Sequence, residues 1–167
     1  KLFIARDRMG IKPLYFNSTS KAFTFASNTQ ALLTQELDKS INPIALQQQL
    51  SLHGVVPAPN TIINGIQKLK PGSYMILSSD GQIQQKTYWI PNAKRPANEV
   101  SDEEYIEKTH ELLTAAVTKR MNASDVPIGV LLSGGLDSSL IVALLREAGH
   151  ERIRTFSIGF EDIDDEA

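Results

Sequence analysis

Residue types suited to binding a phosphate stand together in the string Ser133-Gly-Gly-Leu-Asp-Ser138. Because glycine has no Cβ atom, backbone N–H groups in such a turn can approach an anion closely, and a helix that begins here adds free N–H groups and a favourable dipole. The kinase-type phosphate loop carries a lysine after its glycines, whereas Asp137 follows here. A carboxylate beside a polyphosphate needs a cation between them, so Asp137 implies Mg²⁺. The string predicts a pyrophosphate cradle, and the alternative is a plain glycine turn before a core helix.

Asp7 is a second carboxylate that could bind a ligand. It lies between Arg6 and Arg8 in the string Ala5-Arg-Asp-Arg-Met-Gly-Ile-Lys-Pro-Leu-Tyr15. A carboxylate at the end of a strand can bind an ammonium ion, and we expect the flanking arginines to keep it ionised. A lone Arg-Asp-Arg sequence more often forms an ion pair of purely structural value. Taken by itself, the string leaves both roles open.

A strand–loop–helix–strand unit is expected to position the first string. The short apolar run at residues 130–132 predicts a buried parallel strand, and residues 155–160 predict a second strand. Between them we expect an amphipathic helix that begins at Asp137 and stops at Gly149. Its buried face would consist of Leu140, Ile141, Ala143, Leu144 and Leu145.

Antiparallel strands are expected around the second string. Residues 1–5 predict a strand that ends just before Asp7, and Gly10 suits a positive φ in the turn that follows. Hairpins are expected at residues 14–16 with 22–26, and at residues 73–77 with 82–88 around Asp80-Gly81.

Capping signals predict three further helices. They are expected over residues 29–37 with a capping box of Ser27 and Gln30, from Asn42-Pro43 to Gly54, and over residues 102–121 with a capping box of Ser101 and Glu104. We expect the apolar residues of the last helix to pack rather than to bind ligands. These are Tyr105, Ile106, Leu112, Leu113, Ala116 and Val117.

Composition argues against several classes of protein. The 167 residues carry a formal net charge of −2 and no basic stripe, so nucleic acid is not an expected partner. No apolar run has the length of a membrane span and no signal-peptide pattern opens the chain, so no membrane association is expected. The lack of cysteine fits a reducing cytoplasm and leaves no thiol nucleophile. Residues 91–100 are polar and proline-bearing, which predicts a linker between domains at residues 1–90 and 101–167.

The two strings each resemble a motif of a known family. Residues 133–138 resemble the pyrophosphate loop of the N-type ATP pyrophosphatases, and residues 6–15 resemble the end of the glutaminase domain of class II (N-terminal nucleophile) glutamine amidotransferases. Both occur in this order in the glutamine-hydrolysing asparagine synthetases, which the chain resembles over nearly its whole length. The other matching segments are residues 25–33, 56–61, 68–72, 88–89 and 155–161.

This resemblance implies an α/β fold with two parts. The first would be an α+β glutaminase remainder of the N-terminal nucleophile hydrolase type, and the second the start of a Rossmann-like parallel-sheet ATP pyrophosphatase domain. Because Lys1 falls at once into a strand pattern and the chain stops soon after the second cradle strand, we expect a fragment across the junction of a longer protein.

The resemblance also implies a two-site enzyme. A cysteine upstream of Lys1 would release ammonia from glutamine, and a second site would use ATP and Mg²⁺ to convert an aspartate carboxylate into an acyl-adenylate that ammonia attacks. By position, Asp7 would bind the α-ammonium group of glutamine and Asp137 would bind Mg²⁺. The expected ATP-binding residues are Leu131, Ser133, Gly134, Gly135, Asp137, Ser138 and Ile158. No catalytic residue is expected within these 167 residues.

Other assignments stay open. Residues 53–59 and 145–149 also resemble the N-acetylglutaminylglutamine amidotransferases, which amidate a dipeptide through the same half-reactions. A synthetase that uses free ammonia would share the pyrophosphate loop but would have no use for residues 6–15. A third alternative is a module that binds nucleotide or a partner without catalysis. The oligomeric state is open as well, with a homodimer as one alternative.

Some residues depart from the family pattern or carry no expected role. Asn28 stands where many asparagine synthetases carry glutamate, which puts coupling between the two sites in doubt. His53, His110 and His150 have no partner at metal-ligand spacing, and none is expected to be catalytic.

Overall fold

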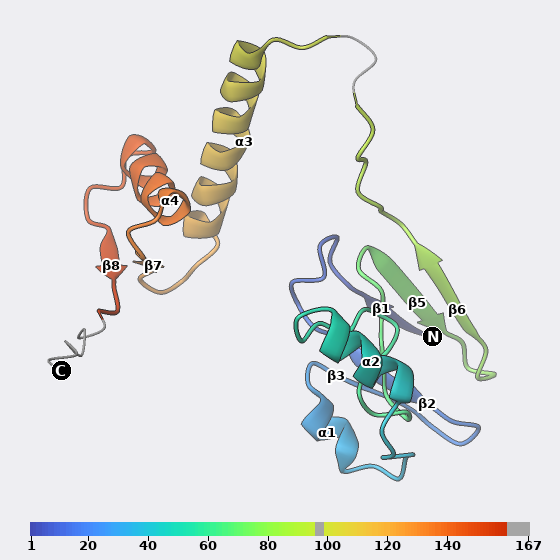
Figure 1. Cartoon of the computed structure of the whole chain (residues 1–167). Coiled ribbons are helices and arrows are strands. Elements are labelled where there is room, and N and C mark those ends of the chain that lie inside the picture. The colour runs from blue at the N-terminus through green and yellow to red at the C-terminus, as the bar shows by residue number, and fades with distance from the viewer. Residues whose placement is uncertain (96–98, 160–167) are drawn as a thin grey trace, which may run out of the picture. The chain divides into compact units, whose positions relative to one another are not determined.

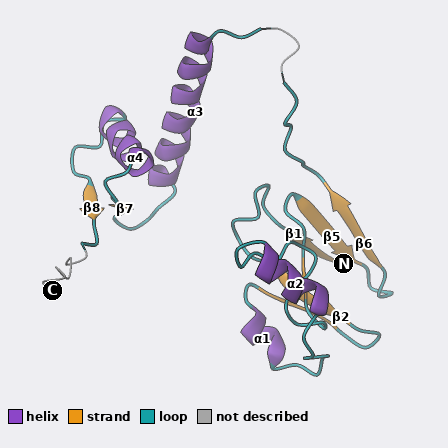
Figure 2. Cartoon of the chain, viewed as in Figure 1, coloured by secondary structure: helices purple, strands orange, loops and turns teal. Residues whose placement is uncertain are grey.

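The computed structural model describes residues 1–95 and 99–159 of the chain. The chain divides into two compact units, Lys1–Ala93 and Lys94–Ala167 (Figure 1). Antiparallel sheets in the first unit and a small parallel sheet in the second give a mixed α/β protein, as expected (Figure 2).

Two three-stranded antiparallel sheets make up most of the first unit. One has the order β1-β5-β6, with strands Leu2–Ala5, Ser73–Leu77 and Ile83–Thr87. The other has the order β3-β2-β4, with strands Phe23–Ala26, Tyr15–Ser18 and Gln67–Lys68. The first strand and both predicted hairpins are confirmed. The two-residue β4 is too short to leave a pattern in the sequence, and it was not predicted.

A small core joins these two sheets. Ile4 of β1, Phe16 of β2, Met75 of β5 and Leu69 after β4 are buried against one another. The Phe16 and Phe23 rings stack with their centroids 5.8 Å apart. Because Ile4 lies near the end of β1, the core holds that strand in place just before Asp7.

Two short helices follow the β2–β3 hairpin, and each differs in detail from its prediction. Helix α1 spans Thr29–Leu33, and Asn28 caps it by accepting a hydrogen bond from the Ala31 N–H at 2.9 Å. The predicted capping box of Ser27 and Gln30 is therefore wrong. The helix ends before residue 37 because the Thr34 hydroxyl donates to the Ala31 carbonyl at 2.8 Å and closes the last turn.

Helix α2 spans Pro43–Ser51 and begins at the predicted cap, since the Asn42 side chain accepts from two N–H groups of the first turn. It ends before Gly54 because His53 already has a φ of +50°. The Gly54 N–H then donates to the Gln49 carbonyl at 2.9 Å.

The second unit contains the expected strand–loop–helix–strand arrangement. Helix α3 (Asp102–Asn122) begins at the predicted capping box of Ser101 and Glu104. Strands β7 (Gly129–Leu131) and β8 (Arg154–Phe156) are parallel, and helix α4 (Leu136–Glu147) connects them. The second strand is shorter than predicted, and residue 160 lies outside the described residues.

Burial in this unit differs from the prediction. Leu144 and Leu145 are buried, whereas Leu140, Ile141 and Ala143 on the same helix are exposed. The strand β7 is not buried either, and α3 has no buried residue. The physical reason is that a two-stranded sheet and two helices cannot cover every apolar face of one another.

Within residues 1–95 and 99–159, no helix combines the length and apolar character that crossing a bilayer requires.

Candidate functional site

Asp7 lies in a tight turn directly after β1, with both carboxylate oxygens held by peptide N–H groups. Its Oδ2 atom accepts from the Ile11 N–H and its Oδ1 atom from the Lys12 N–H, each at 2.9 Å. Gly10 takes a φ of +68°, as predicted, and its N–H donates to the Asp7 carbonyl at 3.1 Å. The carboxylate is partly exposed, so its remaining lone pairs can accept from a ligand cation.

The hydrogen bonds from Lys12 and Ile11 hold the pKa of Asp7 below its ordinary value, and the charge of Arg6 contributes least. Arg6 therefore acts in the expected direction, but the peptide N–H groups, which were not predicted, contribute most to keeping Asp7 ionised. The alternative of a structural ion pair fails, because neither arginine forms an ion pair with Asp7 in the described part of the chain.

The neighbouring strand ends anchor the Asp7 turn from a second side. The Gly72 N–H donates to the Asp7 carbonyl at 3.0 Å, and the Tyr88 hydroxyl donates to the Arg6 carbonyl at 2.8 Å. Gly72 itself has a φ of +60°, and a Cβ atom there would clash with the Trp89 carbonyl. Only glycine therefore fits at this junction.

The candidate pyrophosphate cradle is the loop between β7 and α4. Gly134 has a φ of +80°, and a Cβ atom placed on it would meet no atom within 4 Å. The Ser133 and Ser138 hydroxyls lie 3.1 Å apart, and the Ser138 hydroxyl donates to the Gly135 carbonyl at 3.2 Å. The structure thus brings Ser133, Gly134, Gly135 and Ser138 together in one loop with open space beside Gly134.

The N-terminus of α4 opens onto this loop. Gly135 is the N-cap residue, and no side chain among the described residues caps the helix. The first N–H groups of a helix have no partner inside it, so they are free to bind an anion. Asp137 lies in the first turn and is exposed.

This donor set fits a triphosphate with a divalent cation. Peptide N–H groups and two hydroxyls would hold phosphate oxygens, and the Asp137 carboxylate is the hard oxygen ligand that Mg²⁺ prefers. In the described ranges, no three His, Cys, Asp or Glu side chains gather at a metal-binding spacing. Asp137 would therefore share the ion with phosphate oxygens, which is the usual arrangement for Mg²⁺ with nucleotides.

The two apolar residues expected beside the nucleotide lie at the carboxyl ends of the parallel strands. Leu131 ends β7 with 78% of its surface exposed, and Ile158 follows β8 with 82% exposed. Open α/β sheets bind nucleotides at this edge. The Leu132 N–H donates to the Phe156 carbonyl at 2.8 Å and the Ser157 hydroxyl donates to the Leu132 carbonyl at 2.7 Å, so the strand ends are fastened together.

Sequence reasoning missed two residues that support these loops. Gly129 in β7 lies under the Phe156 ring, which a Cβ atom at Gly129 would penetrate. Arg6 donates to three backbone carbonyls of its surroundings. A glycine inside a predicted strand signals the close approach of another group, so the sequence could have indicated the contact at Gly129. Nothing in the sequence indicates the bonds from Arg6 to backbone carbonyls.

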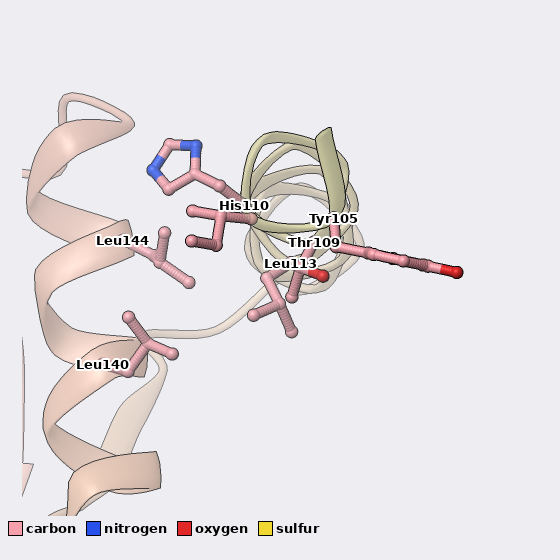
Figure 3. A pocket seen from close by; sticks show the side chains of 7 residues that line it. Tyr105, Thr109, His110, Leu113, Leu140 and Leu144 are labelled. Carbon is pink, nitrogen blue, oxygen red and sulfur yellow. The ribbon is translucent and has the colours of Figure 1, made fainter. Parts of the chain in front are cut away.

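A groove between α3 and α4 is the other notable hollow of the second unit. It encloses about 330 Å³. Figure 3 shows Leu140 and Leu144 of α4 pointing toward α3, while the Tyr105 ring points away from α4. The His110 Nε2 atom lies 3.0 Å from the Glu147 Oε2 atom across the same helix pair. None of the predicted nucleotide-binding residues lines this groove, and His110 links α3 to α4 through Glu147.

Comparisons with known proteins give matches over both units. Residues 1–89 match the family described as glutamine amidotransferase domain, and residues 108–167 match the family described as asparagine synthase. The protein named asparagine synthetase (glutamine-hydrolyzing) 1 of Bacillus subtilis (strain 168) is 39% identical over 160 residues, which cover 96% of this chain and 24% of the relative.

Two further relatives carry similar names. A putative asparagine synthetase (glutamine-hydrolyzing) 2 of Methanocaldococcus jannaschii is 37% identical over 171 residues, covering 99% of this chain and 32% of the relative. Asparagine synthetase (glutamine-hydrolyzing) 3 of Bacillus subtilis is 32% identical over 169 residues, which cover 98% of this chain and 27% of the relative. The chain therefore spans about a quarter to a third of the length of these relatives.

Proposed function

The chain belongs to the class II glutamine amidotransferase family, with the start of an asparagine synthase domain after the glutamine amidotransferase domain, and from that premise we propose that the whole protein makes an amide from glutamine nitrogen and ATP. Aspartate is the proposed acceptor and asparagine the product, because the relatives described above are named as asparagine synthetases. We place the domain boundary within residues 91–100, and the division of the chain between Ala93 and Lys94 supports this position.

In the first half-reaction, Asp7 would bind the α-ammonium group of glutamine. Its support is local: the turn presents an ionised, partly exposed carboxylate whose orientation is fixed by two peptide N–H groups. The 167 residues contain no cysteine, so the thiol that attacks glutamine would lie elsewhere in the whole protein.

In the second half-reaction, the loop at residues 133–138 would hold the phosphates of ATP while the aspartate carboxylate displaces pyrophosphate. The free N–H groups at the start of α4 and the Ser133 and Ser138 hydroxyls would bind phosphate oxygens. Mg²⁺ held by Asp137 and the phosphates would neutralise charge on the leaving pyrophosphate. Leu131 and Ile158 would border the adenine and ribose at the exposed strand ends. Ammonia would then attack the acyl-adenylate, so that the new C–N bond replaces the bond to the phosphate and AMP and a proton leave as the amide forms.

One observation carries this proposal: the loop combines two glycines and an exposed Asp137 at an uncapped helix N-terminus between parallel strands. A lysine-bearing phosphate loop would favour transfer of the terminal phosphate, whereas Asp137 favours a metal-bound pyrophosphate. The glutamine amidotransferase match over residues 1–89 favours glutamine over free ammonia as the nitrogen source.

Replacing Asp137 with asparagine tests the proposal in the whole protein. We expect Asp137→Asn to lower ATP-dependent asparagine formation by roughly 100-fold or more, because a charge that holds the cation is lost, and to leave glutamine hydrolysis unchanged. Asp125→Asn is the matched control, because Asp125 is an exposed aspartate of the same unit outside the loop. Equal synthesis rates in the two variants, measured by amino-acid chromatography, would refute the assignment of Asp137.

A further inference from the structure

The Arg6 side chain forms all its hydrogen bonds in the described structure with backbone carbonyls. Its guanidinium donates to the carbonyls of Leu69 at 2.6 Å, Gly10 at 2.9 Å and Lys12 at 3.2 Å. A guanidinium presents its five N–H donors in a rigid planar fork, so three acceptors in different directions fix its position. Arg6 is therefore a rigid centre around which the following turn folds.

The Asp7 carboxylate binds the opposite side of one peptide that Arg6 holds, and a neighbouring N–H of Lys12. The Gly10 carbonyl and the Ile11 N–H belong to one planar peptide, in which the two bonds point in opposite directions. Arg6 holds the carbonyl side of this peptide, and Asp7 Oδ2 accepts from its N–H side at 2.9 Å. Lys12 is bound through two successive peptides, since its carbonyl, in the peptide after it, accepts from Arg6 and its N–H, in the peptide before it, donates to Asp7.

The remaining bond ties this turn to the core. Leu69 is almost completely buried, and its carbonyl accepts the shortest of the three bonds from Arg6. A Cβ atom at Gly10 would lie 3.2 Å from the Arg6 Cζ atom and 2.7 Å from Pro71 Cγ, so the turn fits closely over the guanidinium. A displaced guanidinium would therefore release the Gly10–Ile11 peptide, whose N–H orients Asp7 Oδ2, and would loosen its hold on Lys12, whose N–H binds Asp7 Oδ1.

We infer that Arg6 is a positioning residue, which clamps the peptides after Asp7 so that its carboxylate meets the α-ammonium group of glutamine. This inference rests on the proposed role of Asp7. In this proposal Arg6 contacts neither glutamine nor the reacting atoms, and it acts through the Gly10–Ile11 peptide and through Lys12. A lysine in its place keeps the positive charge but cannot reach three carbonyls with a planar fork.

Arg8 provides a matched control on the other side of Asp7. It is exposed, and its guanidinium forms no hydrogen bond or ion pair with any other residue of the described ranges. Arg8→Lys therefore makes the same chemical change at the same distance along the chain, without touching the clamp.

Steady-state kinetics of the whole protein test the inference. We expect Arg6→Lys to raise the KM for glutamine roughly tenfold or more and to leave ammonia-dependent synthesis unchanged, since misplacing a binding group by about 1 Å has effects of this size. Arg8→Lys should match the parent protein. In an Asp7→Asn background, Arg6→Lys should add nothing further, because both changes then act on one interaction.

The outcomes separate this inference from the proposed function. If Asp7→Asn leaves the KM for glutamine unchanged, the proposed role of Asp7 fails, and the inference about Arg6 fails with it. If Asp7→Asn raises KM but Arg6→Lys does not, only the positioning role is overturned. Equal losses with glutamine and with ammonia in Arg6→Lys would also overturn it, because that result indicates a general loss of structure.

An NMR titration of the Asp7 carboxyl carbon in the 167-residue chain gives a second readout. Because the N–H groups of Lys12 and Ile11 lower the pKa of Asp7, loosening the clamp should raise that pKa toward its ordinary value. We expect this rise in Arg6→Lys and not in Arg8→Lys. An unchanged pKa in Arg6→Lys would contradict the clamp directly.

Discussion

Asp7 shows how a carboxylate can be kept ionised mainly by peptide N–H groups, with only a small contribution from a neighbouring cation. Two peptide N–H groups stabilise its charge, and the nearby guanidinium is bound to carbonyl groups instead of to the carboxylate. An ion pair with Arg6 would have competed with an ammonium ligand for the same oxygens. Peptide donors leave a net negative charge on Asp7, which a ligand ammonium group can neutralise.

The lowered pKa of Asp7 leads to a prediction about acid stability. Its folded-state pKa lies below the unfolded value, so Asp7 stabilises the first unit above the unfolded pKa, and this contribution disappears as pH falls through the folded pKa. We therefore expect Asp7→Asn to lose less stability than the parent chain between pH 7 and about pH 3. Urea unfolding followed by the fluorescence of Trp89, the only tryptophan, measures this difference. If the free energy of unfolding falls by the same amount in both proteins as the pH is lowered, this prediction is contradicted.

At the scale of the elements, glycines decide how closely the strand ends approach the loops that follow. Gly72 joins the Asp7 turn to the end of β6, because its N–H donates to the Asp7 carbonyl and its own carbonyl accepts from the Tyr88 and Trp89 N–H groups. Gly129 has a similar role in the second unit, where the Phe156 ring occupies the space of a side chain. Each glycine lets one element lie against another without a gap.

Two glycines of the first unit allow a matched comparison. Gly72 and Gly81 both have positive φ, at +60° and +84°, but a Cβ atom would clash with Trp89 at Gly72 and meet nothing at Gly81. Gly81→Ala should cost about 1 kcal/mol from backbone strain alone, and Gly72→Ala about 1–3 kcal/mol more because of the clash. Urea unfolding of the two variants measures the difference. An equal decrease in the free energy of unfolding would show that the close approach of Trp89 to Gly72 does not add to the cost of the substitution.

Local signals in the sequence were sufficient for the elements whose causes are themselves local. The capping box of Ser101 and Glu104, the Asp80-Gly81 hairpin and the glycine loop before α4 depend on residues a few positions apart. The capping box of Ser27 and Gln30 failed because Asn28, one residue later, competes for the same helix start.

Features that depend on distant residues could not be predicted. The role of Arg6 depends on the Leu69 carbonyl, 63 residues away in the chain. The β4 strand exists because two residues pair with β2, which no pattern within them indicates. Burial of a helix face likewise depends on which elements pack against it. Leu140 and Ile141 were predicted to be buried, but the described residues do not cover them.

At the scale of the whole molecule, the proposed function assigns one chemical task to each of the two compact units. The first unit has a core shared by two sheets and presents Asp7 at a strand end. The second has its buried leucines on α4 and presents the glycine loop at the start of the same helix. In the proposed reaction the first unit takes part in releasing ammonia and the second in activating a carboxylate, so each half-reaction can be inactivated separately by a substitution in its own unit.

The nucleotide product is the most direct test of this account. The whole protein is incubated with glutamine, aspartate and ATP radiolabelled at the α- and γ-phosphates, and the labelled products are separated by chromatography. If the loop at residues 133–138 holds a leaving pyrophosphate, AMP and pyrophosphate appear in amounts equal to the asparagine formed. If ADP and inorganic phosphate appear instead, the loop does not support adenylylation and the proposed function is wrong.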